Sequence, residues 1–367
     1  MQTGLAQLPL HTGQAPAWLF SRMVRLAREI ICHIVSEYDS DEVLRRLSDP
    51  FWFQAFGCVL GFDWHSSGVT TTTTAAIKQG IKGLAKELGL YAAGGKGAAS
   101  RKTPREIEIA CEQLGSDADP LVYASRMSAK VDSAAVQDRY QLYHHAFFLS
   151  RTGRWSVVQQ GMNEEARMAR RYHWLGEQVS SFVCEPHAAV CCDGRSVSLN
   201  LVARESEAVR AASTELAGQP WHETQNIIGR LPELVLPHRH AVAMADINPR
   251  YLNKILLRTY ERAPRDFESL LSIEGVGPQT LRALALASEL IYGTPASTRD
   301  PARFAFAHGG KDGTPFPVDR ATYERTITIL HQALHRAKVE RSEKVRALKR
   351  LAQLEQTGPI QPTSVLF

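Results

Sequence analysis

The sequence predicts an α+β fold, in which a mixed N-terminal domain with a β-hairpin precedes a mainly helical domain. Three observations lead to this prediction. Two strand-like runs within 143–162 flank a turn at 151–154, apolar residues recur at helical spacing over 17–48, and helical patterns dominate beyond residue 200. A chain of 367 residues is long for one core, so we expect two domains, 1–200 and 201–355, followed by a loose tail over 356–367.

The N-terminal half alternates helical and strand-like patterns. Two amphipathic helices fit 17–48, with Asp39 and Ser40 as polar caps between them, and the apolar run over 50–62 belongs to the core. A threonine-rich loop then precedes a helix over 75–90, and a glycine- and lysine-rich loop follows over 91–104. Further elements are a helix that begins with a capping box at Thr103–Glu106 and ends near 115, the hairpin, and short strands within 180–186 and 196–202.

The second half is expected to be helical. Its predicted helices cover 203–217, 221–230, 249–261, 267–273, 278–292, 320–336 and 338–355.

Composition indicates a soluble protein of the cytoplasm. Hydrophobic residues make up 44% and charged residues 22%, which is ordinary for a globular chain with a buried core. The six cysteines form no CxxC pair and fit reduced thiols, and we expect neither a signal peptide nor a membrane span. A net charge of +5 permits a polyanionic partner without requiring one.

A glycine pair, Gly275 and Gly277, lies between two predicted helices. A dinucleotide-binding loop would need a preceding strand and a third glycine, and a Walker A loop is absent, so no nucleotide cofactor is expected. The spacing instead fits a helix-hairpin-helix, in which the glycines let a DNA phosphate approach the N–H groups that begin the second helix. The alternative is an ordinary corner between two helices. The candidate DNA-binding residues of this turn are Gly275, Val276, Gly277, Gln279 and Thr280.

Two further groups of residues follow the hairpin. Lys311 lies in "HGGKDG", which is either a tight turn or a phosphate-gripping loop, and Arg320 begins a helix beside it. Asp319 resembles the aspartate that follows the hairpin in base-excision DNA glycosylases, where it stabilises an oxocarbenium-like sugar. Gln279 stands where bifunctional members of that superfamily carry lysine, and Asp319 is alternatively the plain N-cap of helix 320–336.

The N-terminal half offers candidate catalytic and metal-binding groups. Asp63 and His65 follow an apolar run and precede a row of hydroxyl side chains that alternatively only cap the next helix. Asp132, Asp138 and His144 lie before or within the hairpin, with His145, Gln159 and Gln160 nearby in the sequence. Carboxylates on neighbouring strands are typical of nucleases that use Mg²⁺ or Mn²⁺, so Asp63, His65, Asp132 and Asp138 are the candidate metal ligands.

Several distinctive strings carry a resemblance over nearly the full length of the chain, among them "FWFQAFGCVLGFDWHSSGVTTTT", "VVQQGM", "RRYHW" and "FAHGGKDGTPFPVDR". They resemble a prokaryotic domain-of-unknown-function family, which implies a common two-part architecture and assigns no catalytic residue. From the residues themselves we expect a DNA repair or processing enzyme, a metal-dependent nuclease that binds the DNA backbone without sequence preference. The alternatives are a glycosylase-like enzyme that uses Asp319 and a non-catalytic DNA-binding adaptor.

Overall fold

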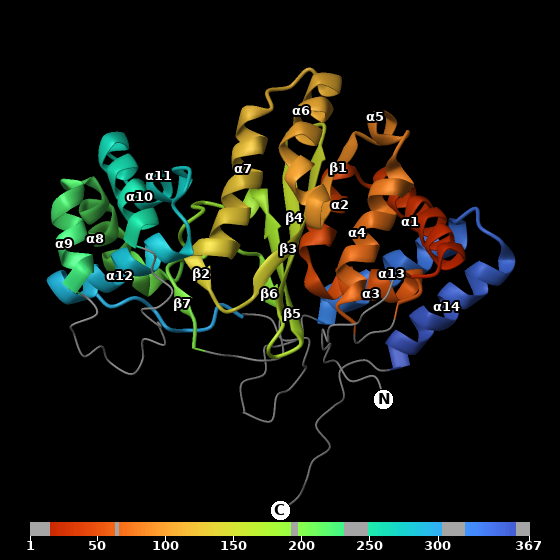
Figure 1. Ribbon diagram of the computed structural model, residues 1–367. Helices are drawn as coiled ribbons and strands as arrows, with labels where there is room; N and C mark the ends of the chain where they lie inside the picture. Colours follow the sequence, from red (N-terminus) through yellow and green to blue (C-terminus); the bar gives the residue numbers. More distant parts are fainter. Residues whose placement is uncertain (1–14, 63–65, 192–196, 231–248, 303–319, 357–367) are drawn as a thin grey trace, which may run out of the picture.

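The computed structural model describes residues 15–62, 66–191, 197–230, 249–302 and 320–356 (Figure 1). The helices before the hairpin are α1 (Ala17–Glu37), α2 (Ser40–Ser48), α3 (Pro50–Leu60), α4 (Gly68–Ile81), α5 (Ala85–Leu88), η1 (Gly97–Lys102), α6 (Thr103–Leu114), α7 (Asp119–Lys130) and η2 (Val131–Ala135). The strands are β1 (Leu90–Lys96), β2 (Val136–Gln137), β3 (Gln141–Ser150), β4 (Trp155–Asn163), β5 (Met168–Leu175), β6 (Ala189–Cys191) and β7 (Leu199–Asn200). The later helices are η3 (Gly176–Gln178), η4 (Arg204–Ser206), α8 (Glu207–Gly218), α9 (Trp221–Arg230), α10 (Pro249–Arg262), α11 (Phe267–Ser272), α12 (Pro278–Tyr292), α13 (Arg320–Arg336) and α14 (Arg341–Gln356).

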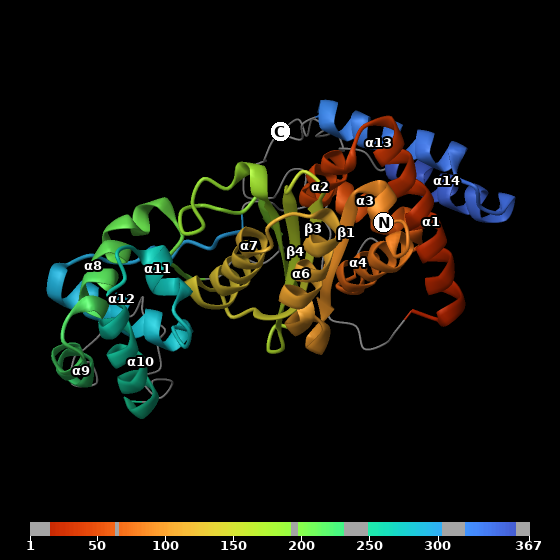
Figure 2. The same cartoon turned by 90° about the horizontal axis from the view of Figure 1, so that it is seen from above.

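An antiparallel sheet of order β1-β3-β4-β5-β6 divides the N-terminal half into two layers, which confirms the predicted α+β class. Successive residues of a strand point to opposite faces of the sheet. Ala146 and Phe148 belong to the core with α1–α4, whereas Phe147 and Leu149 belong to the core with α6 and α7. Figures 1 and 2 show α1–α4 on one side of the sheet and α7 on the other.

The predicted hairpin is confirmed as β3 and β4, joined at 151–154. Gly153 adopts φ +78°, the left-handed conformation that glycine reaches without steric cost. The amphipathic helices over 17–48 are likewise confirmed, and Asp39 caps α2 by accepting a hydrogen bond from the N–H of Glu42 at 2.6 Å.

The structure corrects the prediction for the segment between α3 and α6. The threonine run is helical and forms α4, because this segment packs against α1 and the sheet, and hydroxyl groups such as that of Thr74 bond within the helix, to the carbonyl of Thr70 at 2.9 Å. The predicted helix over 75–90 therefore ends at Ile81. Part of the predicted loop over 91–104 belongs to strand β1. Gly94 allows this strand, because a Cβ atom there would lie 2.2 Å from the carbonyl oxygen of His145.

Three local predictions also need correction. Residues 180–186 form turns instead of a strand, and the unpredicted strands β5 and β6 complete the sheet. Helix α6 is present, but its capping box is not, because the hydroxyl of Thr103 donates to the carbonyl of Ser100. The carboxylate of Glu106 accepts from the N–H of Gly94 at 2.6 Å and from Lys78 at 2.7 Å.

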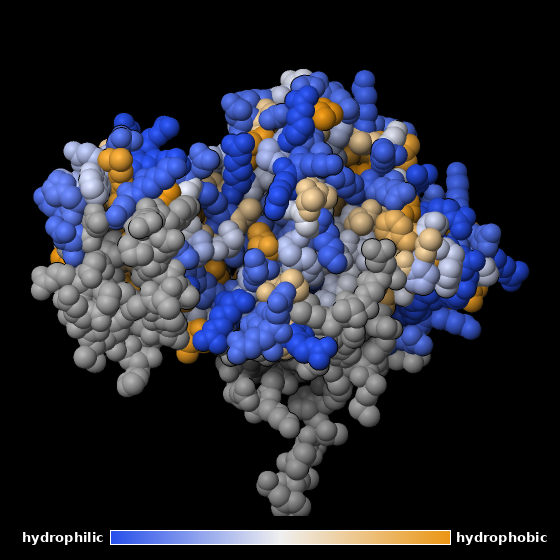
Figure 3. Space-filling model, viewed as in Figure 1, coloured by the Kyte–Doolittle hydropathy of each residue, from blue (hydrophilic) through white to orange (hydrophobic). Residues whose placement is uncertain are grey.

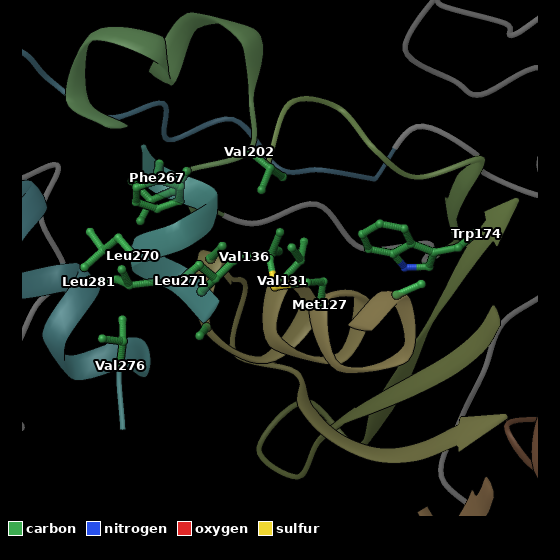
Figure 4. Packing of buried hydrophobic residues seen from close by; sticks show 14 of the residues in the cluster. Met127, Val131, Val136, Trp174, Val202, Phe267, Leu270, Leu271, Val276 and Leu281 are labelled. Carbon is green, nitrogen blue, oxygen red and sulfur yellow. The ribbon is translucent and has the colours of Figure 1, made fainter. Parts of the chain in front are cut away.

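One apolar core joins the sheet to the helices after residue 200. Figure 4 shows Met127 and Val131 between Trp174 of β5 and the side chains of α11 and α12, including Leu271 and Leu281. Helices α11 and α12 therefore pack against η2 and α7, and through them the group α8–α12 joins the side of the sheet that carries α6 and α7. The turn between α11 and α12 is in this way tied to the N-terminal half.

Helices α13 and α14 lie apart from α8–α12 and beside α1 and α3, where Leu330, Leu334 and Leu351 join the core of the first four helices (Figures 1 and 2). The predicted C-terminal domain thus contributes helices to both ends of the molecule. The visible face is mainly hydrophilic, with hydrophobic side chains in small groups (Figure 3). In the ranges that the structure describes, each helix is too short or too polar to cross a bilayer.

Candidate functional site

The turn between α11 and α12 is the first candidate site. Helix α11 begins at a capping box formed by Asp266 and Ser269, and α12 begins with Pro278 in its first turn. Gly275 adopts φ +92°, and a Cβ atom there would lie 2.4 Å from Cδ1 of Ile255. The fold itself therefore requires glycine at position 275.

Gly277 differs from Gly275, because the surrounding structure leaves room for a side chain. Its backbone is extended, with φ −136° and ψ −170°, and a Cβ atom would have only the carbonyl oxygen of Gly275 nearby, at 3.9 Å. Gly277 is the N-cap residue of α12, and no side chain caps this helix. The first N–H groups of a helix lack partners within it and carry the positive end of its dipole. This N-terminus is thus available to an anion.

The other predicted residues of the turn are placed differently. Val276 is buried and anchors the turn in the core, while Gln279 is exposed. Thr280 is fully buried and its hydroxyl has no hydrogen-bond partner among the described residues, so its side chain faces the interior.

Side chains from neighbouring elements hold the turn in place. The ammonium group of Lys130, at the end of α7, donates to the carbonyls of Leu271 and Ile273 at 2.5 and 2.6 Å. Burial lowers the pKa of Lys130 to about 8. Arg258 of α10 donates to the carbonyl of Glu274 at 2.8 Å. The carbonyls of Leu271, Ile273 and Glu274 are therefore satisfied, and the turn is fixed from two sides.

Asp132 is the centre of a buried polar network on the α7 face of the sheet. Its Oδ2 atom accepts from Nε2 of Gln159 at 2.5 Å and from Nε1 of Trp174 at 3.0 Å, and its Oδ1 atom accepts from Nε2 of His187 at 2.5 Å. His145 extends the network, because its Nδ1 atom donates to Oε1 of Gln159 at 2.7 Å. All five side chains are buried. Both carboxylate oxygens of Asp132 are thus engaged with donors.

Asp138 lies in a second network on the same face. It accepts from Nη1 of Arg170 and from the hydroxyl of Tyr172, both at 2.7 Å, and from the N–H of Tyr140 at 3.1 Å. Arg170 also donates to Asp300 at 2.9 Å. Burial raises the pKa of Asp138, while the guanidinium of Arg170 opposes this shift.

His144 points to the opposite face of the sheet, toward α4. Its Nε2 atom lies 3.0 Å from the hydroxyl of Thr74, and burial lowers its pKa to about 3. On the same face Arg171 donates to Oε1 of Gln54 and to Nε2 of His173, both at 2.9 Å. Burial lowers the pKa of Arg171 to about 10 and that of His173 well below its usual value. The sheet therefore separates His144 from Asp132 and Asp138.

The structure brings only part of the predicted catalytic set together. Asp132 accepts a hydrogen bond from Gln159, which in turn bonds to His145, while His144 and Gln160 lie on the opposite face of the sheet. Four predicted residues lie outside the described residues, namely Asp63, His65, Lys311 and Asp319. Arg320 is the first residue of α13, which packs with α1 and not with the turn.

Some partners of this network were not predicted. His187 is not among the predicted site residues, yet it pairs with Asp132. The string "RRYHWL" could have indicated these contacts. In a strand, alternate residues point to opposite faces, so Arg170, Tyr172 and Trp174 share one face. Arg171 and His173 share the other face. Polar residues on both faces of one strand indicate polar layers on both sides of the sheet.

A metal ion at Asp132 or Asp138 would have to displace hydrogen-bond donors that already occupy these carboxylates. Within the described ranges, no group of three or more His, Cys, Asp or Glu side chains is arranged to hold a metal ion. The metal site predicted at Asp63, His65, Asp132 and Asp138 therefore stays a prediction.

Comparison with known proteins gives one match. No curated protein and no solved structure matches this chain. The model of the family described as "Protein of unknown function (DUF763)" matches residues 4–318, and the chain belongs to this family.

Proposed function

We propose that this protein binds the DNA backbone at the turn between α11 and α12 and acts in DNA processing. The observation that carries the proposal concerns Gly277. The local fold has room for a Cβ atom at this position and does not itself require glycine there. An absent side chain at an uncapped helix N-terminus is what a closely approaching phosphate needs. Contact of this kind recognises phosphate and not base sequence.

The surroundings of the turn suit a rigid anion contact. Lys130 and Arg258 bind the carbonyl groups of the turn, which keeps these acceptors away from an approaching phosphate. The chain as a whole carries a net charge of +5, which favours a polyanion.

Substitution of Gly277 by alanine tests this proposal. We expect the variant to fold like the wild type, because the extended backbone and open space accept a Cβ atom. Loss of one charge-assisted hydrogen bond to phosphate costs about 1.5–3 kcal/mol, so DNA affinity should fall about 10- to 100-fold at fixed salt. Fluorescence anisotropy with labelled duplex and single-stranded DNA measures the change.

The matched control is Gly218→Ala at the end of α8, where an added Cβ atom also meets nothing within 4 Å. This control should bind DNA like the wild type. A folded Gly277→Ala protein with unchanged affinity would exclude the turn as the DNA contact.

For the chemistry we propose metal-dependent hydrolysis of a phosphodiester, with Asp63 and His65 as the candidate groups. Ser67, two residues after His65, accepts a hydrogen bond from Gln160 at 3.0 Å. The chain therefore passes from this segment to the face of the sheet that carries His144. A non-catalytic DNA-binding adaptor is the second candidate, because the carboxylates of Asp132 and Asp138 serve contacts within the fold.

A cleavage assay separates the two candidates. We expect labelled single-stranded or duplex DNA to be cut with Mg²⁺ or Mn²⁺, and the cutting to stop with EDTA or in Asp63→Ala. The exposed residue Glu112 supplies the control, since Glu112→Ala should cleave normally. Binding without cleavage by the wild type would select the adaptor. Abasic sites that form in EDTA would instead favour glycosylase chemistry at Asp319.

A further inference from the structure

Strands β3 and β4 carry two neighbouring His–Gln pairs that differ in one respect. His145 is paired with Gln159 across the strands and His144 with Gln160, and the two pairs point to opposite faces. In the first pair the imidazole bonds directly to the amide oxygen at 2.7 Å. In the second pair Nδ1 of His144 and Oε1 of Gln160 are buried, and neither has a hydrogen-bond partner among the residues that the structure describes. We call His144 and Gln160 the open pair.

The atom of His144 that lacks a partner is an acceptor. The hydroxyl of Thr74 lies 2.9 Å from the carbonyl of Thr70 and 3.0 Å from Nε2 of His144. We assign its hydrogen to the carbonyl, so that the hydroxyl oxygen accepts from Nε2 of His144. Burial keeps this imidazole neutral by lowering its pKa to about 3. A neutral imidazole with its proton on Nε2 presents a bare lone pair at Nδ1.

The atom of Gln160 that lacks a partner is an acceptor as well. Its Nε2 atom donates to the carbonyl of Ser67 at 3.0 Å and to the hydroxyl of Tyr143. If the side-chain amide of Gln160 were flipped, its Oε1 atom would face the carbonyl oxygen of Ser67. The contact with Ser67 therefore determines the orientation of the amide. Two buried acceptors side by side call for a ligand that donates two hydrogen bonds.

The charges around the open pair favour a neutral donor on an anionic molecule. The positive charge of Lys96 contributes to the lowered pKa of His144. Arg171 is the cross-strand neighbour of Gln160 on strand β5. Both would repel a cationic ligand. Lys96 is exposed, and its ammonium lies 5.8 Å from the ring centroid of Tyr143, which in turn contacts Gln160. A series of contacts thus runs from a surface cation through an aromatic ring to the open pair.

We propose that the open pair binds the exocyclic amino group of a nucleobase, adenine or cytosine, with Tyr143 beside the base and Lys96 beside its phosphate. An amino group has two N–H donors, one for Nδ1 of His144 and one for Oε1 of Gln160. The choice of a nucleobase among neutral donors rests on the proposed DNA binding. The site would read a base that has left its duplex or belongs to a single strand.

Two nucleotides that differ only in the amino group test this proposal on the full chain. Isothermal titration should show saturable binding of 2′-deoxyadenosine monophosphate. The affinity for purine 2′-deoxyriboside monophosphate should be at least about tenfold lower, as expected when one or two hydrogen bonds are lost. Equal affinity for the two nucleotides, or no binding of either, would overturn the proposal and leave the open pair to a buried water molecule.

Variants extend the test. Gln160→Met removes the acceptor and should abolish the preference for the amino group, whereas Gln113→Met on the exposed face of α6 should keep it. The comparison of nucleotides on the wild type needs no variant, so a Gln160→Met protein that fails to fold does not weaken the test. Gly277→Ala should discriminate the two nucleotides like the wild type. Failure of the nucleobase site and failure of the hairpin contact are therefore observed separately.

Discussion

Replacement of Asp132 by alanine is expected to lower the free energy of unfolding by about 3–5 kcal/mol, because three buried hydrogen-bond donors lose their acceptor and each unsatisfied donor costs about 1–3 kcal/mol. The carboxylate receives hydrogen bonds from Gln159, Trp174 and His187, and all three side chains are buried. Without Asp132 these donors lose their acceptor and cannot reach water, so each retains its desolvation penalty. Urea unfolding followed by circular dichroism measures the loss.

Two variants control this experiment. Asp132→Asn keeps one oxygen for Gln159 and Trp174, and its amide can face His187 if that imidazole moves its proton to Nδ1, so the expected loss is smaller, about 1–2 kcal/mol. The exposed Glu112→Ala should change stability by less than about 0.5 kcal/mol. If Asp132→Ala were as stable as the wild type, the carboxylate of Asp132 would not stabilise the fold, and a role in catalysis or binding would explain its position instead.

The sequence predicts those elements whose stability is local. The hairpin of β3 and β4 follows from a turn with glycine at position 153, and α1 and α2 follow from apolar periodicity and the cap at Asp39. Strand β1 was missed because its glycines resemble a loop, whereas they allow close contact with β3. The first half of helix α4 was missed because five successive threonines favour strands or loops intrinsically, and only packing against α1 and the sheet makes them helical.

The candidate site is predictable only in part, for a geometric reason. His144 with His145, and Gln159 with Gln160, are neighbours in the sequence, but the strand period assigns each residue of a pair to a different face. One cluster in the sequence therefore becomes two in space. The pairing of Asp132 with His187 joins residues from η2 and from the loop before β6, and no local pattern indicates such a contact. The turn at Gly275 and Gly277 can be recognised in the sequence because its glycines and Pro278 lie within a short stretch, whereas the contacts of Lys130 and Arg258 that hold it cannot.

Replacement of Arg170 by methionine is the second large effect that we expect. Arg170 is fully buried and neutralises Asp138 and Asp300, at 2.7 and 2.9 Å. Methionine fills most of the volume but removes the guanidinium that pairs with the buried carboxyl group of Asp138, which should cost about 3–5 kcal/mol near neutral pH. Thermal or urea unfolding of the two proteins under identical buffer measures the difference.

The pH dependence of this loss identifies its cause. Burial already raises the pKa of Asp138, and removal of the Arg170 guanidinium, which lowers that pKa, should raise it further. A carboxyl whose pKa is higher in the folded than in the unfolded state binds more protons when folded, so its stabilising contribution is present at low pH and is lost as the pH rises through the folded pKa. The difference in the free energy of unfolding between wild type and Arg170→Met should therefore shrink as the pH falls from 7 toward about 4, the pKa of an unperturbed aspartate.

The double variant Arg170→Met/Asp138→Leu removes one uncompensated charge and should recover part of the loss at neutral pH. A loss that is the same at both pH values, and that the second substitution does not reduce, would mean that Arg170 stabilises the sheet through packing on Tyr140 and not through its charge.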